Sequence, residues 1–269
     1  MIAHNGKPIT IAMRNRKPIN LIARNGKAMF GEFTAISLAA KAAIIAEYGD
    51  VVWQDTRDYA KAHPAIVEFI NQDPHLACSI SPNSNKERYI ITSGIAGIDT
   101  GIYVNPKDVL SFAFGCDNLP SSGYNRVTPY GCVNQCWMRI ERVNWIESAL
   151  SSQSNVGICT FEANKVYEIE VNTNGVYKIG SITVSNRGSL FATTTNTLWL
   201  FKKAGNYSDT YIKRMRYFRV KDSEGNDRIH LIPHLTADGQ CGMLDLVSAT
   251  FHPNANTSGQ FTIQVTDKQ

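Results

Sequence analysis

Residues 166–179 read Val-Tyr-Glu-Ile-Glu-Val-Asn-Thr-Asn-Gly-Val-Tyr-Lys-Ile. The first six alternate polar and apolar side chains, with Glu168 and Glu170 on one face, as expected for a β-strand with one buried side. Thr173-Asn174-Gly175 is a turn signal, because Asn and Gly accept the positive φ angles of tight turns. Val176–Ile179 is again a strand sequence. This segment therefore predicts a β-hairpin.

The same pattern of strand-like runs and turns extends over most of residues 85–269. Short β-type runs are separated by turn clusters, and few helical patterns interrupt them. The runs include Tyr89–Thr92, Val109–Phe114 and Leu198–Phe201, and the turn clusters include 186–188, 223–226 and 237–239. Many short strands with Gly/Asn turns are typical of a β-sandwich or jelly roll. We therefore expect a mainly β protein with a two-sheet jelly-roll sandwich over residues 85–269.

Residues 32–84 have a different composition and predict a helical segment with a linker. Residues 32–48 are rich in Ala and aliphatic side chains, and Gly49 suits the end of a helix. A helix that is apolar around most of its circumference is buried on several sides, which for a short segment favours packing against copies of itself. We expect an oligomer helix built on four small or aliphatic residues: Ile36, Ala40, Ala43 and Ile44.

A second helix is expected next, capped by Asp55 or Thr56. Pro64 suits the first turn of a new helix and predicts a break there. The helical region then ends at residues 71–74, and residues 81–85 read as a linker.

A ten-residue repeat occupies the first thirty residues. Its units are Asn5-Gly6-Lys7-Pro8-Ile9, Asn15-Arg16-Lys17-Pro18-Ile19 and Asn25-Gly26-Lys27-Ala28-Met29. Each unit joins a turn signal to a short apolar run, which predicts small β-hairpins. Thirty such residues cannot build a core of their own. We therefore expect residues 1–31 to be an arm that binds a partner surface.

The positive charge of the chain lies in this arm. The whole chain carries 27 basic and 23 acidic residues, whereas the first acidic residue is Glu32. The basic residues alternate with aliphatic ones, and no aromatic side chain precedes Phe30 for bases to stack on. This favours an acidic protein surface over nucleic acid, although a meander with a solvated basic face fits the same sequence. The expected docking residues are Asn5, Lys7, Ile9, Arg14, Arg16, Lys17, Ile19, Arg24 and Lys27.

No motif for catalysis, a cofactor or a metal stands out. Six cysteines are present, and Cys132 and Cys136 have the wrong spacing for a redox Cys-x-x-Cys pair. We expect most of the cysteines to be buried small residues. Glu168 and Glu170 fit the outward face of an edge strand better than a glycosidase pair. Three aspartates lack the spacing of a calcium loop: Asp99, Asp117 and Asp245. We expect no enzyme activity, no cofactor and no metal.

Hydropathy argues against a membrane protein. No run of eighteen apolar residues occurs. The N-terminal apolar runs are interrupted by Arg and Lys, so we expect neither a signal peptide nor membrane binding.

The chain resembles appendage proteins of gut bacteriophages that carry a concanavalin-A-like (laminin-G-like) sandwich. Five segments carry the resemblance, in the family's order: Leu198–Phe201, Ile212–Val220, Arg228–Pro233, Gly239–Val247 and Phe251–Asn254. His252 stands where the family usually has Tyr. The N-terminal repeats also resemble the opening of many such phage proteins.

This resemblance implies a structural protein of the virion, a head or tail fibre or a decoration protein. The arm would bind other virion proteins and the sandwich would point outward, in a homo-oligomer that we expect to be a trimer. The alternative is an adhesin that binds host surface glycan. An exposed aromatic flanked by polar groups would serve that role, with Tyr124, Tyr130 and Trp137 as candidates. Trp137 and Trp145 also fit a core position.

Overall fold

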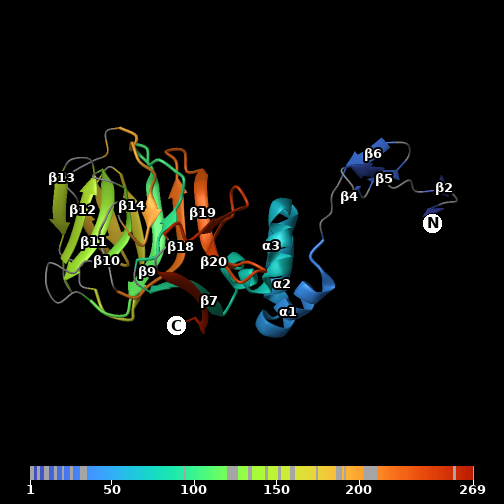
Figure 1. Cartoon of the computed structure of the whole chain (residues 1–269), viewed down its shortest axis with the longest axis horizontal. Helices are drawn as coiled ribbons and strands as arrows, with labels where there is room; N and C mark the ends of the chain where they lie inside the picture. Colours follow the sequence, from blue (N-terminus) through green and yellow to red (C-terminus); the bar gives the residue numbers. More distant parts are fainter. Residues whose placement is uncertain are drawn as a thin grey trace.

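The computed structural model describes residues 35–269 with several gaps (Figure 1). The gaps are 94, 120–126, 133–134, 143–144, 151–152, 158–160, 174, 186–189, 191, 203–210, 257–258 and 269. Only the backbone is described for residues 93, 141–142, 145–150, 153–157 and 185 and for six short strands before residue 31. Within these residues, no helix is long and apolar enough to cross a membrane.

Two antiparallel sheets form the body of the protein. Among the described residues the smaller sheet has six strands, in the order β13-β12-β11-β10-β17-β8. Their bounds are Gln153–Gly157, Trp145–Leu150, Cys136–Arg142, Val127–Cys132, Trp199–Leu200 and Ile98–Asp99. The expected strand at Leu198–Phe201 is therefore present between β10 and β8, but only two of its residues have strand geometry.

The larger sheet has ten strands in the part of the chain that is described. Eight of them follow the order β16-β15-β14-β9-β18-β19-β20-β21, while β7 pairs with β18 and β22 pairs with β7. The bounds in that order are Ile182–Ser185, Val176–Ile179, Val166–Asn172, Val109–Cys116, Lys213–Lys221, Asp227–Leu235, Cys241–Asp245 and Thr250–Pro253, with β7 at Lys86–Ser93 and β22 at Gln260–Asp267. The predicted hairpin is β14–β15, in which Asn172 pairs with Val176. The mainly β sandwich is confirmed.

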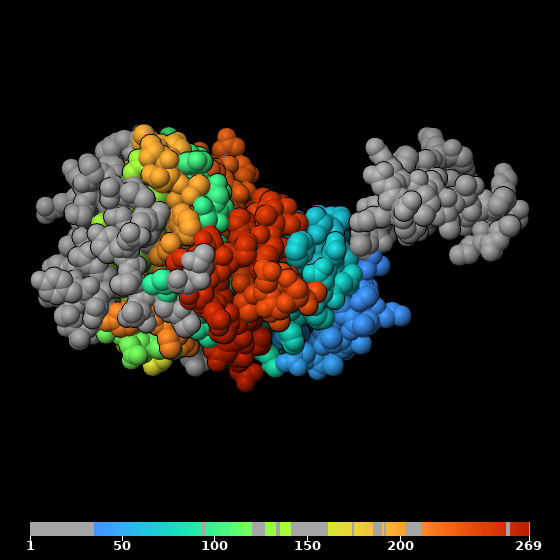
Figure 2. All heavy atoms as spheres, viewed as in Figure 1, coloured from blue at the N-terminus to red at the C-terminus, as the bar shows by residue number. Residues whose placement is uncertain are grey.

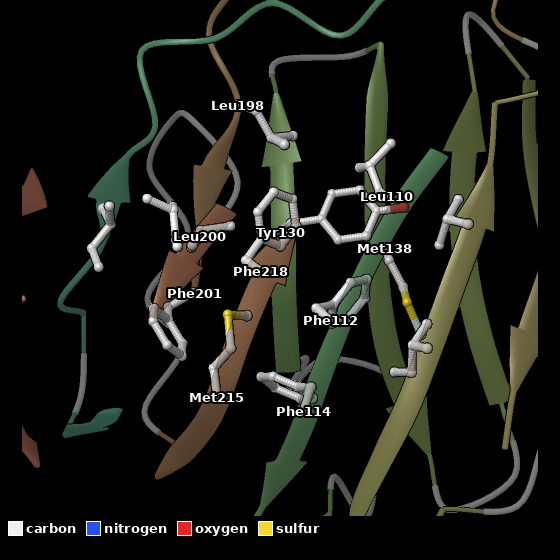
Figure 3. Close-up of a cluster of buried hydrophobic side chains, with 14 of the residues drawn as sticks. Leu110, Phe112, Phe114, Tyr130, Met138, Leu198, Leu200, Phe201, Met215 and Phe218 are labelled. Carbon is white, nitrogen blue, oxygen red and sulfur yellow. The ribbon is translucent and has the colours of Figure 1, made fainter. Parts of the chain in front are cut away.

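The main core lies between the two sheets (Figure 3). Phe112 and Phe114 of β9 point into it from one sheet and Tyr130 of β10 from the other, and all three are fully buried. The rings of Phe112 and Tyr130 meet edge to face, with centroids 5.4 Å apart. Each fully buried aromatic or aliphatic side chain contributes about 1.5–3 kcal/mol, so this layer holds the two sheets together.

Four short α-helices and two 3-10 turns precede β7 among the described residues. They are α1 Leu38–Tyr48, α2 Asp50–Ala62, η1 Pro64–Ile66, α3 Val67–Gln72, η2 Pro74–Leu76 and α4 Ala77–Ile80. Ser37 caps α1, because its side chain accepts a hydrogen bond from the Ala40 N–H. Gly49 ends α1 with φ at 86°, as predicted, and the break at Pro64 is also confirmed.

Three expectations about these helices are wrong. The first helix does not begin at Glu32, because residues 35–37 are not helical and Ser37 supplies the cap; residues 32–34 lie outside the described residues. Asp55 and Thr56 are no caps, since α2 begins at Asp50 directly after Gly49. The helical region also continues beyond residue 74, through η2 and α4.

The helical segment packs on the larger sheet through a second core. Ile44, Ile70 and Leu76 are fully buried there against Ile232 and Leu244 of the sheet. In Figure 2 the helices and the C-terminal strands form one continuous surface. Residues 81–85 are an ordered connector, because the Ser81 hydroxyl donates to Asp55 Oδ2 at 2.5 Å. The helices and the sandwich therefore share packing.

The N-terminal repeats form three separate two-stranded hairpins. Their strands are β1 Ala3–His4 with β2 Lys7–Pro8, β3 Ala12–Arg14 with β4 Lys17–Ile19, and β5 Leu21–Arg24 with β6 Lys27–Phe30. The last pairs before the turns are His4 with Lys7, Arg14 with Lys17 and Arg24 with Lys27. The ten-residue period of the sequence is thus the period of the hairpins.

Candidate functional site

Strand β18 changes its neighbour part-way along its length. Residues 213–215 pair with β7, whereas residues 218–221 pair with β19. On the other edge of β18, the register with β9 shifts between Met215 and Tyr217, so Arg216 is the extra residue of a β-bulge. Bulges bend a strand and re-aim its side chains. The sheet therefore forks at Arg216.

A pocket of about 200 Å³ opens at this fork, and we call it the fork pocket. Strands β7, β18 and β19 contribute to its walls, together with α4 and the residue after β22. Its lining residues are Cys78, Ser79, Ser81, Lys86, Glu87, Arg88, Arg216, Tyr217, His230, Ile232 and Lys268. The segments that form it are thus far apart in the sequence.

An ion pair buried beside the fork pocket joins the helical segment to the sheet. Arg88 of β7 is 2% exposed and Asp73, at the end of α3, is 4% exposed. Arg88 Nη2 donates to Asp73 Oδ2 at 2.6 Å, and the Leu235 N–H donates to the same oxygen at 3.1 Å. His234 Nδ1 lies 3.3 Å from it. Burial alone would raise the pKa of Asp73, but these neighbours hold it at about 2.

Two further cations of the lining have carboxylate partners. Lys86 Nζ lies 2.5 Å from Glu47 Oε1, and this bond lowers the pKa of the Glu47 carboxyl. The Arg216 guanidinium contacts both Glu87 and Glu168. Four cationic side chains line the pocket among the described residues, and three of them have carboxylate partners: Lys86, Arg88 and Arg216. Their charges are therefore largely balanced by these partners.

His230 lies neutral in the pocket wall. Its burial, with the charge of Arg219 nearby, lowers the pKa of the ring to about 4. The ring meets Tyr217 edge to face, with centroids 6.3 Å apart. Burial also raises the pKa of the Tyr217 hydroxyl, which donates to Glu168 Oε2 at 2.6 Å. Both side chains therefore keep their neutral forms near pH 7.

The basic docking residues of the arm flank the hairpin turns. Lys7, Arg14, Lys17, Arg24 and Lys27 lie in strands β2 to β6, next to the turn positions. Ile19 closes β4. Three of the predicted docking residues lie outside the described residues: Asn5, Ile9 and Arg16.

The expected oligomer helix is only partly available to another copy. Ala40 is 2% exposed and Ile44 is fully buried, and Ile44 lies in the core that α1 shares with this chain's own sheet. Ile36 is half-buried against the same core. The prediction that Ala40 and Ile44 face a partner is therefore wrong. Ala43 is exposed.

The predicted glycan contacts are not exposed platforms. Tyr130 is fully buried between the sheets and Trp137 is 6% exposed, so neither ring presents a face to solvent. This overturns the prediction for both and matches the core alternative for Trp137. Tyr124 and the side chain of Trp145 lie outside the described residues. Tyr103, which is not among the predicted contacts, is an exposed aromatic: it is 46% exposed in the loop before β9.

The acidic candidates serve structural roles. Glu168 and Glu170 form ion pairs with Arg216 and Lys178, and β14 lies between β15 and β9 and is not an edge strand. The carboxylate of Asp245 is 3% exposed and accepts the His230 and Val247 N–H groups.

The remaining two aspartates are also engaged. Asp99 accepts the Gly101 N–H at 2.9 Å, and Asp117 contacts the Arg214 guanidinium. In the described part of the chain, no group of three or more His, Cys, Asp or Glu residues could hold a metal ion.

The cysteines agree with the reading from sequence where they are described. Cys78, Cys116, Cys132 and Cys136 are buried, whereas Cys241 is half-buried. Cys132 and Cys136 pair directly across β10 and β11, and the Cys132 thiol donates to the Cys136 carbonyl at 3.3 Å. Cys159 lies outside the described residues.

Comparison with known proteins adds only distant structural likenesses. No protein-family model and no curated protein matches the chain. A candidate carbohydrate-binding protein from Bacteroides ovatus is similar at a TM-score of 0.44 and 10% identity, over 68% of this chain and 60% of that one.

Two further structures are similar at a lower level. One is a botulinum neurotoxin type C structure, described through its interaction with two ganglioside molecules, at a TM-score of 0.34 and 14% identity over 50% of this chain and 42% of that one. The other is a receptor-binding domain, at a TM-score of 0.32 and 11% identity, over 52% of this chain and 45% of that one. Each alignment spans less than two thirds of the other protein's length. At TM-scores below 0.5 these likenesses do not decide the function.

Proposed function

We propose that this protein is a structural appendage of a bacteriophage virion. Its N-terminal arm binds an acidic surface of another virion protein, and its sandwich is displayed outward. The observation that carries the proposal is the separateness of the three arm hairpins, since in the described residues none of them joins either large sheet. An isolated two-stranded hairpin is only marginally stable in water, so a partner surface must complete it.

Charge supports the choice of partner. Six basic residues and no acidic residue occur in positions 1–30, and Arg14–Lys17 and Arg24–Lys27 place two basic residues opposite each other beside a turn. Like charges directly opposite destabilise a strand pair. An acidic partner surface would remove that repulsion on binding.

Immunogold electron microscopy of virions tests this proposal. Antibody raised against residues 85–269 should label intact particles at regular sites. Variant particles in which Arg14 and Lys17 are both replaced by Glu should lose the label, whereas Lys165→Gln in the sandwich should keep it. Absence of the protein from purified virions would exclude the appendage role.

A second candidate function is binding of a host glycan by the sandwich. The exposed ring of Tyr103 favours it, because the neighbouring groups are polar: Arg228 Nη1 donates to the Tyr103 carbonyl at 3.0 Å and Thr193 donates to Asn105 Oδ1 at 2.9 Å. Sugars stack on exposed aromatic faces flanked by hydrogen-bonding groups.

A glycan array tests this second candidate. The full chain should bind one class of bacterial surface glycan, and Tyr103→Ala should abolish binding. Ile182→Ala, at an apolar residue of β16 that is exposed to a similar degree, is the control. Silence of the folded protein on capsular and mucin glycans would rule this function out.

A further inference from the structure

We propose that Cys132 and Cys136 form a disulfide that cross-links strands β10 and β11 when the chain folds in the presence of a small-molecule disulfide oxidant. The structure shows both residues as free thiols. This inference is independent of the appendage role, because only the smaller sheet takes part in it.

The register of the two strands places these cysteines directly opposite each other. Cys132 pairs with Cys136, and the register is regular from there to the pair of Tyr130 with Met138. Directly opposite residues of an antiparallel pair have Cα atoms about 4.5 or 5.5 Å apart, depending on the hydrogen-bond pattern. Both separations lie within the range of about 4.4–6.8 Å that disulfides require. The backbone therefore already has a spacing that a disulfide accepts.

The two thiols also lie on the same side of the sheet and interact. Each is fully buried in the core between the sheets. The Cys132 thiol donates to the Cys136 carbonyl at 3.3 Å. A hydrogen bond between the two side chains lowers the pKa of Cys132 and raises the pKa of Cys136. The sulfur atoms are therefore neighbours, and Cys132 is the thiol that ionises first and acts as the nucleophile.

The other described cysteines have no cysteine opposite them. Cys116 of β9 lies opposite Lys213, and Cys241 of β20 lies opposite Leu235. Cys78 lies in the short helix α4. Among the described residues, the register therefore selects a single cysteine pair.

Exchange with oxidised glutathione forms this bond without another reagent. The Cys132 thiolate attacks one sulfur of the oxidant, which breaks the S–S bond of the oxidant and releases one glutathione. The Cys136 thiolate then attacks the Cys132 sulfur of the mixed disulfide and displaces the second glutathione. Two electrons pass to the oxidant, and the two thiol protons end on the two released glutathione molecules.

Burial decides when this reaction occurs. Neither cysteine has exposed surface in the folded chain, so the oxidant reaches the thiols only during folding or during local opening of the hairpin. Once the hairpin has closed, the same burial protects the disulfide from reductants. The cross-link would then hold β10 to β11 in the part of the sandwich that lies away from the helices (Figure 1).

Mass spectrometry of the full chain tests the proposal. One sample is synthesised in a cell-free reaction that contains a glutathione redox buffer, so that the chain folds in the presence of the oxidant. A second is folded protein incubated with oxidised glutathione, and a third is kept in dithiothreitol. After free thiols are blocked with N-ethylmaleimide, trypsin releases the peptide Val127–Arg139, which contains both cysteines and no other.

The sample that folds with the oxidant should give this peptide without label and two hydrogens lighter than the dithiol. The sample in dithiothreitol should give the peptide with two labels. The melting temperature of the oxidised protein should be about 3 °C higher than that of the reduced protein, as expected for the closure of so short a loop in a chain of this length. Oxidation of the second sample as well would show that local opening admits the oxidant.

Serine variants assign the bond. Cys132→Ser and Cys136→Ser should each abolish it, together with the difference in melting temperature between oxidising and reducing buffer. Cys116→Ser, at a buried cysteine of the larger sheet, is the matched control and should keep both. Because each protein is compared with itself in two buffers, any loss of stability caused by serine itself cancels.

Four results would overturn the proposal. These are a doubly labelled peptide in both samples that meet the oxidant, a disulfide from Cys132 or Cys136 to another cysteine, glutathione attached to one of the two as the final product, and loss of the bond in Cys116→Ser.

Discussion

Asp73 is a buried carboxylate that ties three parts of the chain together. It ends α3, pairs with Arg88 of β7 and accepts the N–H of Leu235 in β19. A buried ion pair adds little net stability over apolar packing, but removing one partner leaves the other charge uncompensated. This side chain therefore adds a buried polar link to the apolar core through which the helices pack on the sheet.

We expect Asp73→Asn to lower the free energy of unfolding by about 3–5 kcal/mol, because the Arg88 charge stays buried without its counter-ion. Urea unfolding followed by circular dichroism measures it. Asp58→Asn breaks an exposed pair on α2 and is the control, which should leave the unfolding midpoint unchanged. Equal effects of the two variants would contradict the assignment.

His230 gives the stability a pH dependence of known direction. Its pKa is about 4 in the folded protein against 6.5 ordinarily, so the unfolded chain takes up a proton first as the pH falls. The stability that the neutral ring contributes is complete above pH 6.5 and is lost as the pH falls from 6.5 to 4. That shift corresponds to about 3 kcal/mol.

We expect His230→Gln to flatten the stability profile between pH 6.5 and 4. Denaturant midpoints measured across this range give the profile. The contribution of His230 can be separated from that of Asp73. The pKa of Asp73 is about 2 in the folded protein, so the stability that this carboxylate contributes is lost only below pH 3.8. An unchanged slope in the variant would show that His230 is not held neutral.

At the level of elements, β20 and β21 approach each other closely at Gly242. A Cβ atom there would meet the Phe251 ring at 2.6 Å and the carbonyl oxygen of His252, which is backbone and cannot move aside. Gly242→Ala should therefore cost about 1–3 kcal/mol, as overpacking does. Thermal unfolding measures it, with Ala237→Gly in the neighbouring turn as a control. A neutral result would mean that the two strands separate easily.

The sequence predicted the strands with strong local signals. The strand Val176–Ile179 has the predicted bounds. As expected, Gly49 ends α1 and Pro64 begins η1. These signals are strong because turns and caps depend on φ angles that few residues accept. The start of α1 was misjudged, since the Ala-rich composition continues through residues that the Ser37 cap excludes. Local composition does not reveal which of several possible caps is used.

The fork pocket could not be predicted from sequence. Its cations come from positions 86–88, 216 and 268, and they meet only because β18 changes partner at a bulge. Register shifts of this kind leave no local pattern. Tyr130 was misjudged for a similar reason: an aromatic in a Gly-rich stretch looks exposed until the facing sheet is known to cover it.

For the whole molecule, the prediction from sequence is a trimer whose arm is not needed for assembly. Ala40 and Ile44 are used internally, so a partner would meet the outer face of the helices, where Leu38 is 85% and Val51 58% exposed. Light scattering of the full chain and of a form lacking residues 1–31 should give trimers in both cases. A truncated monomer would place assembly in the arm.

The pairing of β7 with β22 has a mechanical consequence. Tension applied to the N-terminus reaches α1 first and passes into the larger sheet through the packed helices. Strand β7 comes after them and begins at Lys86, which lies opposite Asp267 at the end of this eight-residue ladder. A strand pulled from its end peels away one pair at a time, so the ladder alone would resist weakly. Because Arg88 fastens the third residue of β7 to Asp73, the load is shared with the docked helices before any pair beyond it can open. The helical segment therefore takes up part of a load between the arm and the sandwich.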